Sequence, residues 1–506
     1  MNKRFLLISI FVLSILISFS IGLVWGDQEN TYSLLRIFNR VLSNIQSSYV
    51  DSVDNQTLIR GAIKGMIDTL RDPHTNYLNK NEYTSLKIST EGEFGGIGAQ
   101  LGMRNNRPVV ITPIDNTPAK KAGLLPGDVI LKVDGETTEG KNLDEVVRRI
   151  RGKPGTKVTL LIERPILSEP IEFTITRSTI KIDAIPYAGV IKDDIGYIRL
   201  ADFSRTASSE LRDNLDSLFG LGVKKIIFDL RHNSGGLLNE GVEVTECFLG
   251  KEKDIVSTRG RASELRVFKS TADIKYGDFP LVVLIDSSSA SASEIVAGAI
   301  QDWDRGLLIG TNTFGKGSVQ NIFPMEDGGA LKLTVARWFT PSGRCIDKPL
   351  DTLKARELSR IPFTTLGPLH RKVYGAGGIM PDTVIPRKVY SWIEMEILRK
   401  GLYFDFAVKY TNRQKDISKD FMPGPALIDE FKKYLREKEI KFTDAQFDSS
   451  RTEISHSLAQ EIVAIVWGTK AAIALALKRD HYVTTAVAIL ESAKTTKDLF
   501  WFNKKK

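Results

Sequence analysis

Ser291 and Lys316 are the two residues whose types and surroundings best fit covalent catalysis. Ser291 follows the apolar run LVVLI (281–285), which predicts a strand buried on both faces, and precedes a segment whose apolar residues recur at helical spacing. A strand that turns sharply into a helix places one side chain at the helix N-terminus, where backbone N–H groups point outward and negative charge is favoured. Ser291 is therefore predicted to be a nucleophile.

Lys316 stands between two glycines, after a second short predicted strand at 306–310, and Gln320 follows shortly after it. A lysine acts as a general base only when it is neutral, so its ordinary pKa near 10.4 has to fall by roughly 2–3 units, through burial and a lack of nearby carboxylates. A glutamine amide orients the amine without raising its pKa, as a carboxylate would. We expect Lys316 to be the base and Gln320 to orient it.

Simpler interpretations of the same residues exist. A serine after a strand is commonly a helix N-cap, and a lysine between glycines is commonly a solvated loop tip. The stretch 310–316 also reads G-x-x-x-x-G-K, close to a phosphate-binding loop. The next residue is Gly317 rather than a hydroxyl residue that holds Mg²⁺, and the β-branched SVQNIFP that follows predicts no helix. Nucleotide binding is therefore disfavoured.

Composition narrows the class of protein. The chain has 506 residues, of which 42% are hydrophobic and 26% charged, which is ordinary for a globular protein of several domains. The net charge of +9 is spread along the chain, so no nucleic-acid partner is expected. Two cysteines, Cys247 and Cys345, form no disulfide framework, and two free buried thiols are expected. The five histidines form no H-E-x-x-H motif, so neither a metal nor a cofactor is expected.

The first 26 residues predict export. Lys3 and Arg4 precede residues 5–26, which carry no charge and are long enough to span a bilayer. This pattern is typical of a signal peptide or a signal anchor, and the basic residues are expected to stay on the cytoplasmic side. The remainder is predicted to be periplasmic, or anchored in the membrane and facing the periplasm or cell exterior.

Residues 93–177 carry three motifs in register, FGGIGAQL, VVITPIDNTPAKKAGLLPGDVILKVDGE and RGKPGTKVTLLIER, which resemble a PDZ domain of the bacterial protease type. Gly95, Gly96 and Gly98 are predicted to turn consecutive N–H groups inward as a nest for a terminal carboxylate, while Ile97 and Leu101 line an apolar pocket. An exposed strand edge would add a bound peptide as an extra strand. These features predict capture of free apolar C-termini.

The segments SASASEIVAGAIQD and TFGKGSVQ resemble the C-terminal processing peptidases, or tail-specific proteases, and the separation of Ser291 from Lys316 matches the serine–lysine spacing of that family. The DPHT-Y pattern at 72–77 resembles the family's N-terminal region, which contributes to oligomer contacts there. The resemblance extends through ARWFTPSGRCID and GAGGIMPD and ends near residue 389.

The same resemblance implies an oxyanion site. The stretch RHNSGG (231–236) is similar to the family's DLR-x-N-P-G-G loop, with Ser234 where proline is common. In the family this loop gives one backbone donor, which maps to Gly235, and the amide that follows the nucleophile gives the other, which maps to Ala292. A glycine pair after a strand is otherwise only a turn.

The expected fold class is multidomain α/β, with a ClpP/crotonase-like catalytic core as the resemblance implies. The predicted parts are a signal peptide or anchor (1–26), an N-terminal helical domain (30–90), a PDZ domain (93–178), the catalytic core (179–389) and a helical C-terminal domain (390–506) that packs or dimerises.

The predicted activity is that of a serine endopeptidase that binds unstructured C-termini of exported proteins through its PDZ domain and cleaves them through an acyl-enzyme. A homo-oligomer is expected, the membrane is a partner if the anchor is uncleaved, and an adaptor protein is an additional candidate partner. The alternatives are a non-catalytic PDZ scaffold, which would bind without turnover, and an acyl-CoA enzyme on a similar core, which the export signal and the PDZ domain disfavour.

Overall fold

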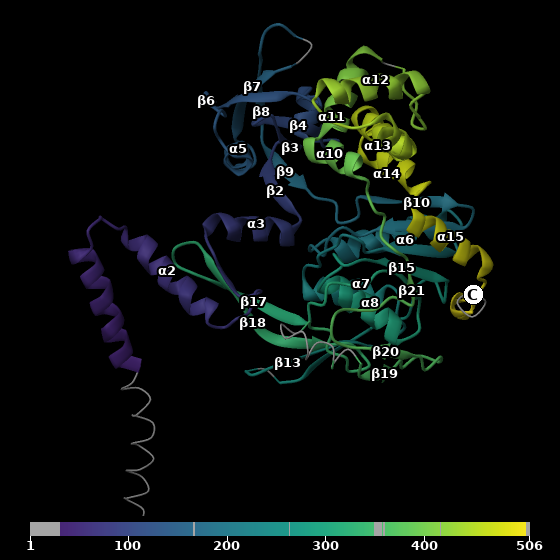
Figure 1. The fold of residues 1–506 in the computed structure, drawn as a ribbon. Coiled ribbons are helices and arrows are strands. Elements are labelled where there is room, and N and C mark those ends of the chain that lie inside the picture. Colours follow the sequence, from purple (N-terminus) through teal and green to yellow (C-terminus); the bar gives the residue numbers. More distant parts are fainter. Residues whose placement is uncertain are drawn as a thin grey trace, which may run out of the picture. The chain divides into compact units, whose positions relative to one another are not determined.

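The computed structural model describes residues 31–164, 167–262, 264–348, 357, 360–414 and 416–501 (Figure 1). The chain divides into two units, of which the first comprises Met1–Lys80 with Gln320–Thr334 and the second comprises Asn81–Val319 with Val335–Lys506. The predicted signal segment, 1–26, lies outside the described residues. Within the described part of the chain, no helix has both the length and the apolar composition that a membrane crossing requires.

The first unit combines helices with a small sheet. It contains a helix over residues 31–48, helix α2 (Asn55–Asp68) and strand β1 (Asn76–Leu78). Strand β1 pairs antiparallel with residues 330–332 of β18 (Ala330–Phe339). The segment predicted as a helical domain, 30–90, therefore also contains a short strand, whose partner comes from far along the chain.

The second unit is centred on a six-stranded sheet with the order β10-β11-β12-β15-β16-β21, in which only β10 runs antiparallel to its neighbour. Its strands are β10 (Tyr187–Lys192), β11 (Ile195–Arg199), β12 (Lys225–Asp229), β15 (Leu281–Ile285), β16 (Leu307–Gly310) and β21 (Thr383–Val384). The apolar run predicted as a doubly buried strand is β15, and each of its residues is buried.

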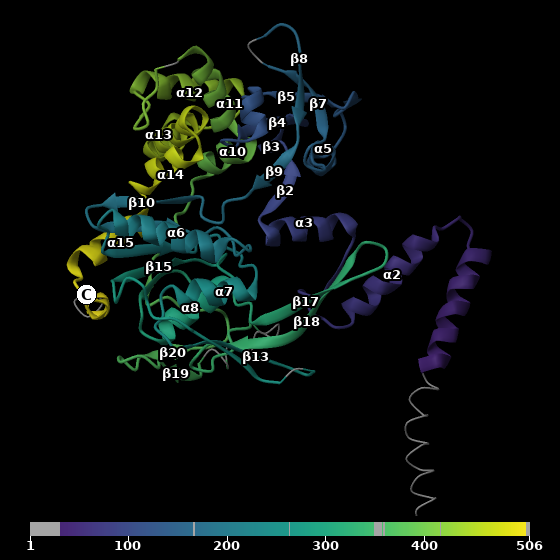
Figure 2. The same ribbon diagram turned by 180° about the vertical axis from the view of Figure 1, so that it is seen from behind.

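Helices cover both faces of this sheet (Figures 1 and 2). On one face lie α6 (Ala207–Gly220), α7 (Leu238–Glu246) and α8 (Ala292–Asp302), which pack on alternate strand residues such as Phe228 and Val283. On the other face α15 (His481–Ser492) packs on the intervening residues Ile227 and Val282. The side-chain alternation of strands therefore creates two cores from one sheet.

Smaller sheets flank the second unit's main sheet. Strand β13 (Asp254–Gly260) pairs with β14 (Arg266–Lys269) and with residues 336–339 of β18, and β19 (Pro362–Thr364) pairs with β20 (Lys372–Tyr374). Strand β17 (Ser318–Pro324) begins directly after the loop that carries Lys316.

The PDZ region forms a sheet with the order β3-β4-β5-β7-β8 around its own hydrophobic core. Its strands are β3 (Ala99–Arg104), β4 (Arg107–Pro113), β5 (Val129–Val133), β7 (Lys157–Glu163) and β8 (Ile171–Thr176), with the two-residue β6 (Glu136–Thr137) beside β5 and helices α4 (Pro118–Ala122) and α5 (Leu143–Ile150). Strands β2 (Glu93–Gly96) and β9 (Ser178–Lys181) pair at the two ends of this region.

The helical region predicted as one domain over 390–506 divides between two cores. Helices α10 (Trp392–Lys400), α11 (Leu402–Arg413), α12 (Pro425–Glu437) and α13 (Asp444–Trp467) share a core of their own. Phe404 and Val408 of α11 also pack against Val109 of the PDZ strand β4. After α14 (Thr469–Leu477), helix α15 leaves this bundle and packs on the six-stranded sheet.

Replacing Leu490 tests whether α15 belongs to the core of the six-stranded sheet. Leu490 is fully buried against the sheet, so Leu490→Ala is expected to reduce the free energy of unfolding by about 2–5 kcal/mol. The matched control is Leu398→Ala on α10, where the side chain is 48% exposed and the expected change is less than about 0.5 kcal/mol. Thermal unfolding of the two variants checks this, and equal shifts would place α15 outside the core.

Candidate active site

Ser291 occupies a strained position at the start of helix α8. Its backbone angles are φ 55° and ψ −113°, a region that residues with a side chain rarely adopt. Strain of this kind persists only where the surroundings enforce it, and here buried strand β15 precedes the residue and buried helix α8 follows it. The structure thus confirms the sharp strand-to-helix turn expected from the sequence, with the serine at the helix N-terminus.

Glu294, which the sequence analysis did not single out, joins the serine to the loop that carries the lysine. Its buried carboxylate accepts hydrogen bonds from the Thr313 hydroxyl (2.6 Å) and the Gly315 amide (2.7 Å) on Oε1. On Oε2 it accepts from the amides of Ser291 (2.8 Å) and Lys316 (2.9 Å). Burial raises the pKa of the Glu294 carboxyl, and these four donors oppose that rise. One carboxylate therefore fixes both backbones that position the expected dyad.

Lys316 is half-buried and lies in a loop held from several sides. The indole of the buried Trp338 donates to the Lys316 carbonyl (3.1 Å), and the Gly317 amide donates to Asp347 Oδ1 (3.0 Å). Gly315 has a φ of 90°, and an added Cβ would lie 3.0 Å from the Gly378 amide nitrogen, so glycine is required there. These contacts fix the backbone of Lys316 rather than leaving it at a solvated loop tip.

Gln320 is the first residue of the 320–334 segment in the first unit. Its side-chain amide donates to the Thr334 hydroxyl (3.3 Å) in that unit. Its role as the orienting partner of Lys316 stays a prediction.

The glycine loop, residues 231–236, packs directly against the predicted nucleophile. A Cβ at Gly235 would lie 2.8 Å from Ser291 Cβ and 2.9 Å from the Ala292 amide nitrogen, and its φ is 94°. Only glycine permits this approach. Ala292 is the first residue of α8, where amides have no partner in the preceding turn, as expected for an oxyanion donor.

The Gly235 amide differs from the prediction in one respect. It donates to the side-chain oxygen of Asn233 (2.8 Å) in this structure, so it is already engaged within its own loop. Asn233 is fully buried, and its amide nitrogen donates to the Leu200 carbonyl (2.9 Å). The glycine is therefore placed as expected, but its N–H has an intramolecular partner.

The predicted carboxylate nest is rearranged in the structure. Gly95 and Gly96 belong to strand β2 and pair with Thr179 and Ser178, so only Gly98, with a φ of 79°, adopts the left-handed conformation that a nest uses. Gly95 is required for another reason, because a Cβ there would lie 2.1 Å from the carbonyl oxygen of residue 152. The prediction that all three glycines form one nest is therefore wrong.

Ile97 and Leu101 are predicted from the sequence to line an apolar pocket for the peptide, and that role stays a prediction. Ile97 is buried in the PDZ core and Leu101 packs on that core from β3. Strand β3 is an edge strand of its sheet, so its outer edge is open to an added strand.

Arg151 adds a charged group that the sequence analysis missed. It follows α5 directly, and its guanidinium lies 4.7 Å from the ring centroid of Phe94, which is in the strand leading to Gly98. Its Nε is buried without a hydrogen-bond partner among the described residues, and burial lowers the pKa of the group. A guanidinium of this kind suits a carboxylate ligand. No sequence signal distinguishes Arg151 from its basic neighbours at 148 and 149.

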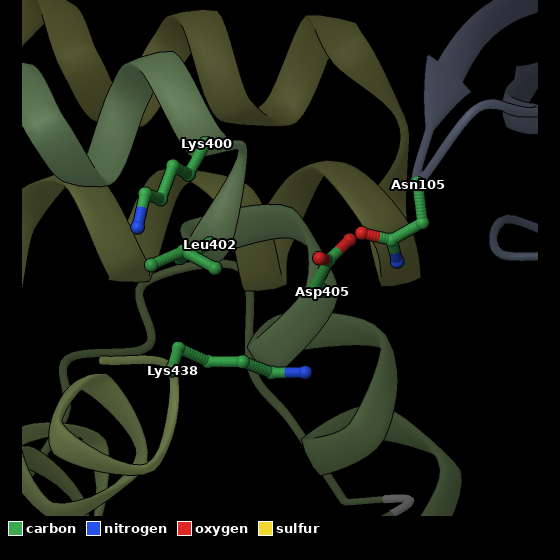
Figure 3. A pocket seen from close by; sticks show the side chains of 5 residues that line it. All are labelled: Asn105, Lys400, Leu402, Asp405 and Lys438. Carbon is green, nitrogen blue, oxygen red and sulfur yellow. The ribbon is translucent and has the colours of Figure 1, made fainter. Parts of the chain in front are cut away.

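A pocket of about 320 Å³ lies elsewhere, between the β3–β4 turn and the helical bundle (Figure 3). Its lining residues are Asn105, Lys400, Leu402, Asp405 and Lys438. It contains none of the predicted site residues. In the part of the chain that the structure describes, no group of three His, Cys, Asp or Glu side chains is placed to hold a metal ion.

The fold and this site together define a PDZ-containing peptidase with an α/β core. Family models match peptidase family S41 at residues 194–351 and a PDZ domain at 109–164. They also match the activating protease CtpB N-terminal domain at 26–82 and a probable PDZ-protease C-terminal helical domain at 393–446.

A carboxy-terminal-processing protease of Bartonella bacilliformis is 42% identical over 351 residues, which cover 68% of this chain and 79% of that protein. The carboxy-terminal processing protease CtpA of Bacillus subtilis is 34% identical over 369 residues, covering 72% of this chain and 78% of that protein. The solved photosystem II D1 C-terminal processing protease is 28% identical, covering 69% of this chain and 86% of that one, with a TM-score of 0.38. The chain belongs to the C-terminal processing peptidases of family S41 and is a serine-type peptidase, which confirms the resemblance seen in the sequence.

Replacing Glu294 by glutamine tests the link between Ser291 and the lysine loop. A glutamine has one acceptor oxygen, so its NH₂ group would face two of the four donors. Displacement of the dyad is expected to lower peptide hydrolysis by about 100-fold, because small misplacements at reacting atoms have effects of that size.

The matched control for that change is Glu240→Gln. Glu240 is also buried, but its Oε2 accepts from one amide, that of Ser208 (2.9 Å), which a glutamine oxygen can replace. The control is expected to retain activity. Full activity of Glu294→Gln would show that the dyad does not depend on this carboxylate.

Proposed function

We propose that the chain is an endopeptidase that hydrolyses peptide bonds with Ser291 and Lys316 through an acyl-enzyme. The observation that carries the proposal is the shared carboxylate of Glu294, which ties the Ser291 amide and the Lys316 amide to one group. A lysine in a solvated loop tip would need no such attachment. The strained backbone of Ser291 supports the same assignment.

In the proposed reaction, the Ser291 hydroxyl attacks the peptide carbonyl carbon as neutral Lys316 accepts its proton. The carbonyl oxygen of the tetrahedral intermediate receives a hydrogen bond from the Ala292 amide, an effect worth about 3–4 kcal/mol per donor. Lys316 then protonates the leaving nitrogen as the C–N bond breaks. Water, deprotonated by Lys316, hydrolyses the ester and restores the serine.

The second oxyanion donor requires a change within the glycine loop. The Gly235 amide is the expected donor, and it contributes only when its hydrogen bond to Asn233 Oδ1 opens. The proposed active form therefore differs from this structure at one hydrogen bond, whereas the close packing of Gly235 on Ser291 is already in place.

The proposal for substrate capture assigns the terminal carboxylate to the N–H groups around Gly98 and to Arg151, with the partly buried Leu101 contacting an apolar side chain. The open edge of β3 supports this assignment, because it offers backbone groups to an extended peptide. The unpartnered Nε of Arg151 supports it as well.

The proposed substrates are exported proteins with unstructured C-termini. Support comes from Lys3, Arg4 and the uncharged residues 5–26, which are typical of export. The chain is proposed to act outside the cytoplasm, either released into the periplasm or attached to the membrane by this segment. A homo-oligomer and an adaptor protein stay predictions.

Variants of the dyad give the direct test of the chemistry. Ser291→Ala is expected to abolish cleavage of an unstructured protein with an apolar C-terminus while peptide binding remains. Lys316→Arg is expected to be as inactive as Lys316→Ala, because arginine keeps its proton at working pH. Gel-based cleavage and thermal unfolding check both, and cleavage by Ser291→Ala or by Lys316→Arg would refute the assigned role of that residue.

Amidating the C-terminus of a model peptide tests capture of the carboxylate. Removing the negative charge is expected to weaken binding by about tenfold or more, the loss that follows from one charge-assisted hydrogen bond. Arg151→Gln is expected to weaken binding of the free-acid peptide and to leave binding of the amide unchanged. Calorimetry on the Ser291→Ala protein measures both, and equal affinity for acid and amide would contradict PDZ capture of the terminus.

A further inference from the structure

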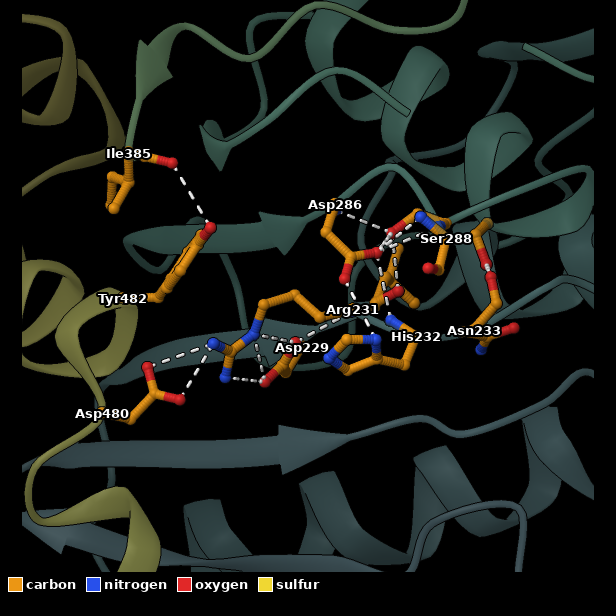
Figure 4. Close-up of polar contacts among 12 residues, drawn as sticks. Asp229, Arg231, His232, Asn233, Asp286, Ser288, Ile385, Asp480 and Tyr482 are labelled. Carbon is orange, nitrogen blue, oxygen red and sulfur yellow. Dashed lines mark hydrogen bonds and ion pairs between the residues drawn. The ribbon is translucent and has the colours of Figure 1, made fainter. Parts of the chain in front are cut away.

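Arg231, the first residue of the glycine loop, is held between two carboxylates (Figure 4). Its Nε contacts both oxygens of the buried Asp229 (3.0 Å each), and its Nη2 donates to Asp229 Oδ2 (2.6 Å). Its Nη1 donates to both oxygens of Asp480 (3.1 and 2.9 Å). Burial alone would raise the pKa of Asp229, but the charge of Arg231, its hydrogen bonds and that of the Tyr197 hydroxyl (2.7 Å) together outweigh burial, and the pKa is lowered. Asp229 and Arg231 therefore form a charged pair.

The glycine loop is joined to the serine loop, residues 286–291. The Ala290 amide donates to the Asn233 carbonyl (3.0 Å), and the Ser289 hydroxyl donates to the Leu230 carbonyl (2.8 Å). The His232 amide donates to Asp286 Oδ1 (3.2 Å). Because of these hydrogen bonds, a displacement of the glycine loop at Arg231 would also displace the serine loop, which ends at the predicted nucleophile Ser291.

The second carboxylate comes from the C-terminal helical region. Asp480 is the N-cap of α15, and its Oδ1 also accepts from the Val483 amide (3.0 Å). Two residues on, the ring centroid of Tyr482 lies 4.8 Å from the Arg231 guanidinium carbon, and the Tyr482 hydroxyl donates to the Ile385 carbonyl (3.3 Å). The start of α15 therefore contacts Arg231 by an ion pair and a cation–π interaction.

We propose that Asp480, assisted by Tyr482, is a positioning residue for the active site, which holds Arg231 and through it the glycine loop beside Ser291. The inference rests on the proposed peptidase function. It assigns to α15, which lies beyond the matched C-terminal helical domain at 393–446, a part in organising the catalytic loops. Asp480 acts through Arg231 and touches no reacting atom in this assignment.

Asp480 can be changed without disrupting the buried charge pair. Arg231 keeps Asp229 as its counter-ion when Asp480 is replaced, so no buried charge is left unpaired. The side chain of Asp480 is 26% exposed, so water can reach the vacated side of the guanidinium. The expected consequence is a less constrained Arg231 in a folded protein.

The helix cap and the ion pair at Asp480 are separable by choice of substitution. Serine and asparagine are both good N-cap residues, but serine does not reach Arg231 and asparagine keeps one acceptor oxygen without the charge. We expect kcat of the full chain to fall about tenfold in Asp480→Ser and by less in Asp480→Asn, with KM nearly unchanged, because the charge-assisted contact of Arg231 Nη1 with the Asp480 carboxylate is lost. A role limited to capping predicts parental kcat in both variants.

Asp498→Asn is the matched control. Asp498 lies in the same C-terminal region and accepts from the amides of Lys494 and Thr495, which belong to its own turn. The same exchange of carboxylate for amide there is expected to leave kcat unchanged.

Hydrogen exchange of residues 230–237 supplies a readout that does not depend on catalysis. Amides of this segment are expected to exchange faster in Asp480→Ser than in the parent and in Asp498→Asn. Faster exchange in Asp480→Ser together with a reduced kcat supports the inference. If the parent protein has no peptidase activity, faster exchange in Asp480→Ser still supports the inference, while the missing activity refutes the proposed function. Unchanged exchange overturns it, whether or not kcat falls.

Discussion

The four hydrogen bonds accepted by Glu294 are the constraint on which the rest of the site depends. Burying a carboxylate without hydrogen-bond partners costs free energy, so the folded chain has to bring donors to it. Two of them are the amides of Ser291 and Lys316, which belong to segments on opposite sides of strand β16 in the sequence. Satisfying one buried group therefore places both elements of the proposed dyad.

The sequence predicted the elements that local patterns determine. The run at 281–285 is apolar on both faces because it is a central parallel strand, and the small residues after it allow the turn into α8. The grouping of Gly235 and Ala292 with Ser291 came from the family resemblance, and in the structure Gly235 packs directly on Ser291. The family resemblance supplied the spacing that local pattern could not.

Glu294, Arg151 and Asp480 escaped prediction because their roles depend on distant partners. On sequence, Glu294 is one acidic residue in the first turn of a helix, where such residues are common, and Asp480 is an ordinary N-cap. Their partners at 313–316 and at 231 are known only from the fold. The division of the C-terminal helices between two cores escaped prediction for the same reason. The apolar faces of α11 and α15 look alike in sequence, although α11 contacts the PDZ sheet and α15 packs on the catalytic sheet.

The saturation of Glu294 also bears on which residue is the base. A carboxylate three residues after a serine is a conceivable proton acceptor, and burial raises its pKa toward the range that a base needs. Its four donors occupy both oxygens and favour the ionised form, so accepting a further proton would require one of these bonds to break. Because each bond fixes a backbone position, protonating Glu294 would loosen the site that it holds together. This argument favours the proposal in which Lys316 is the base and the Glu294 carboxylate acts by position.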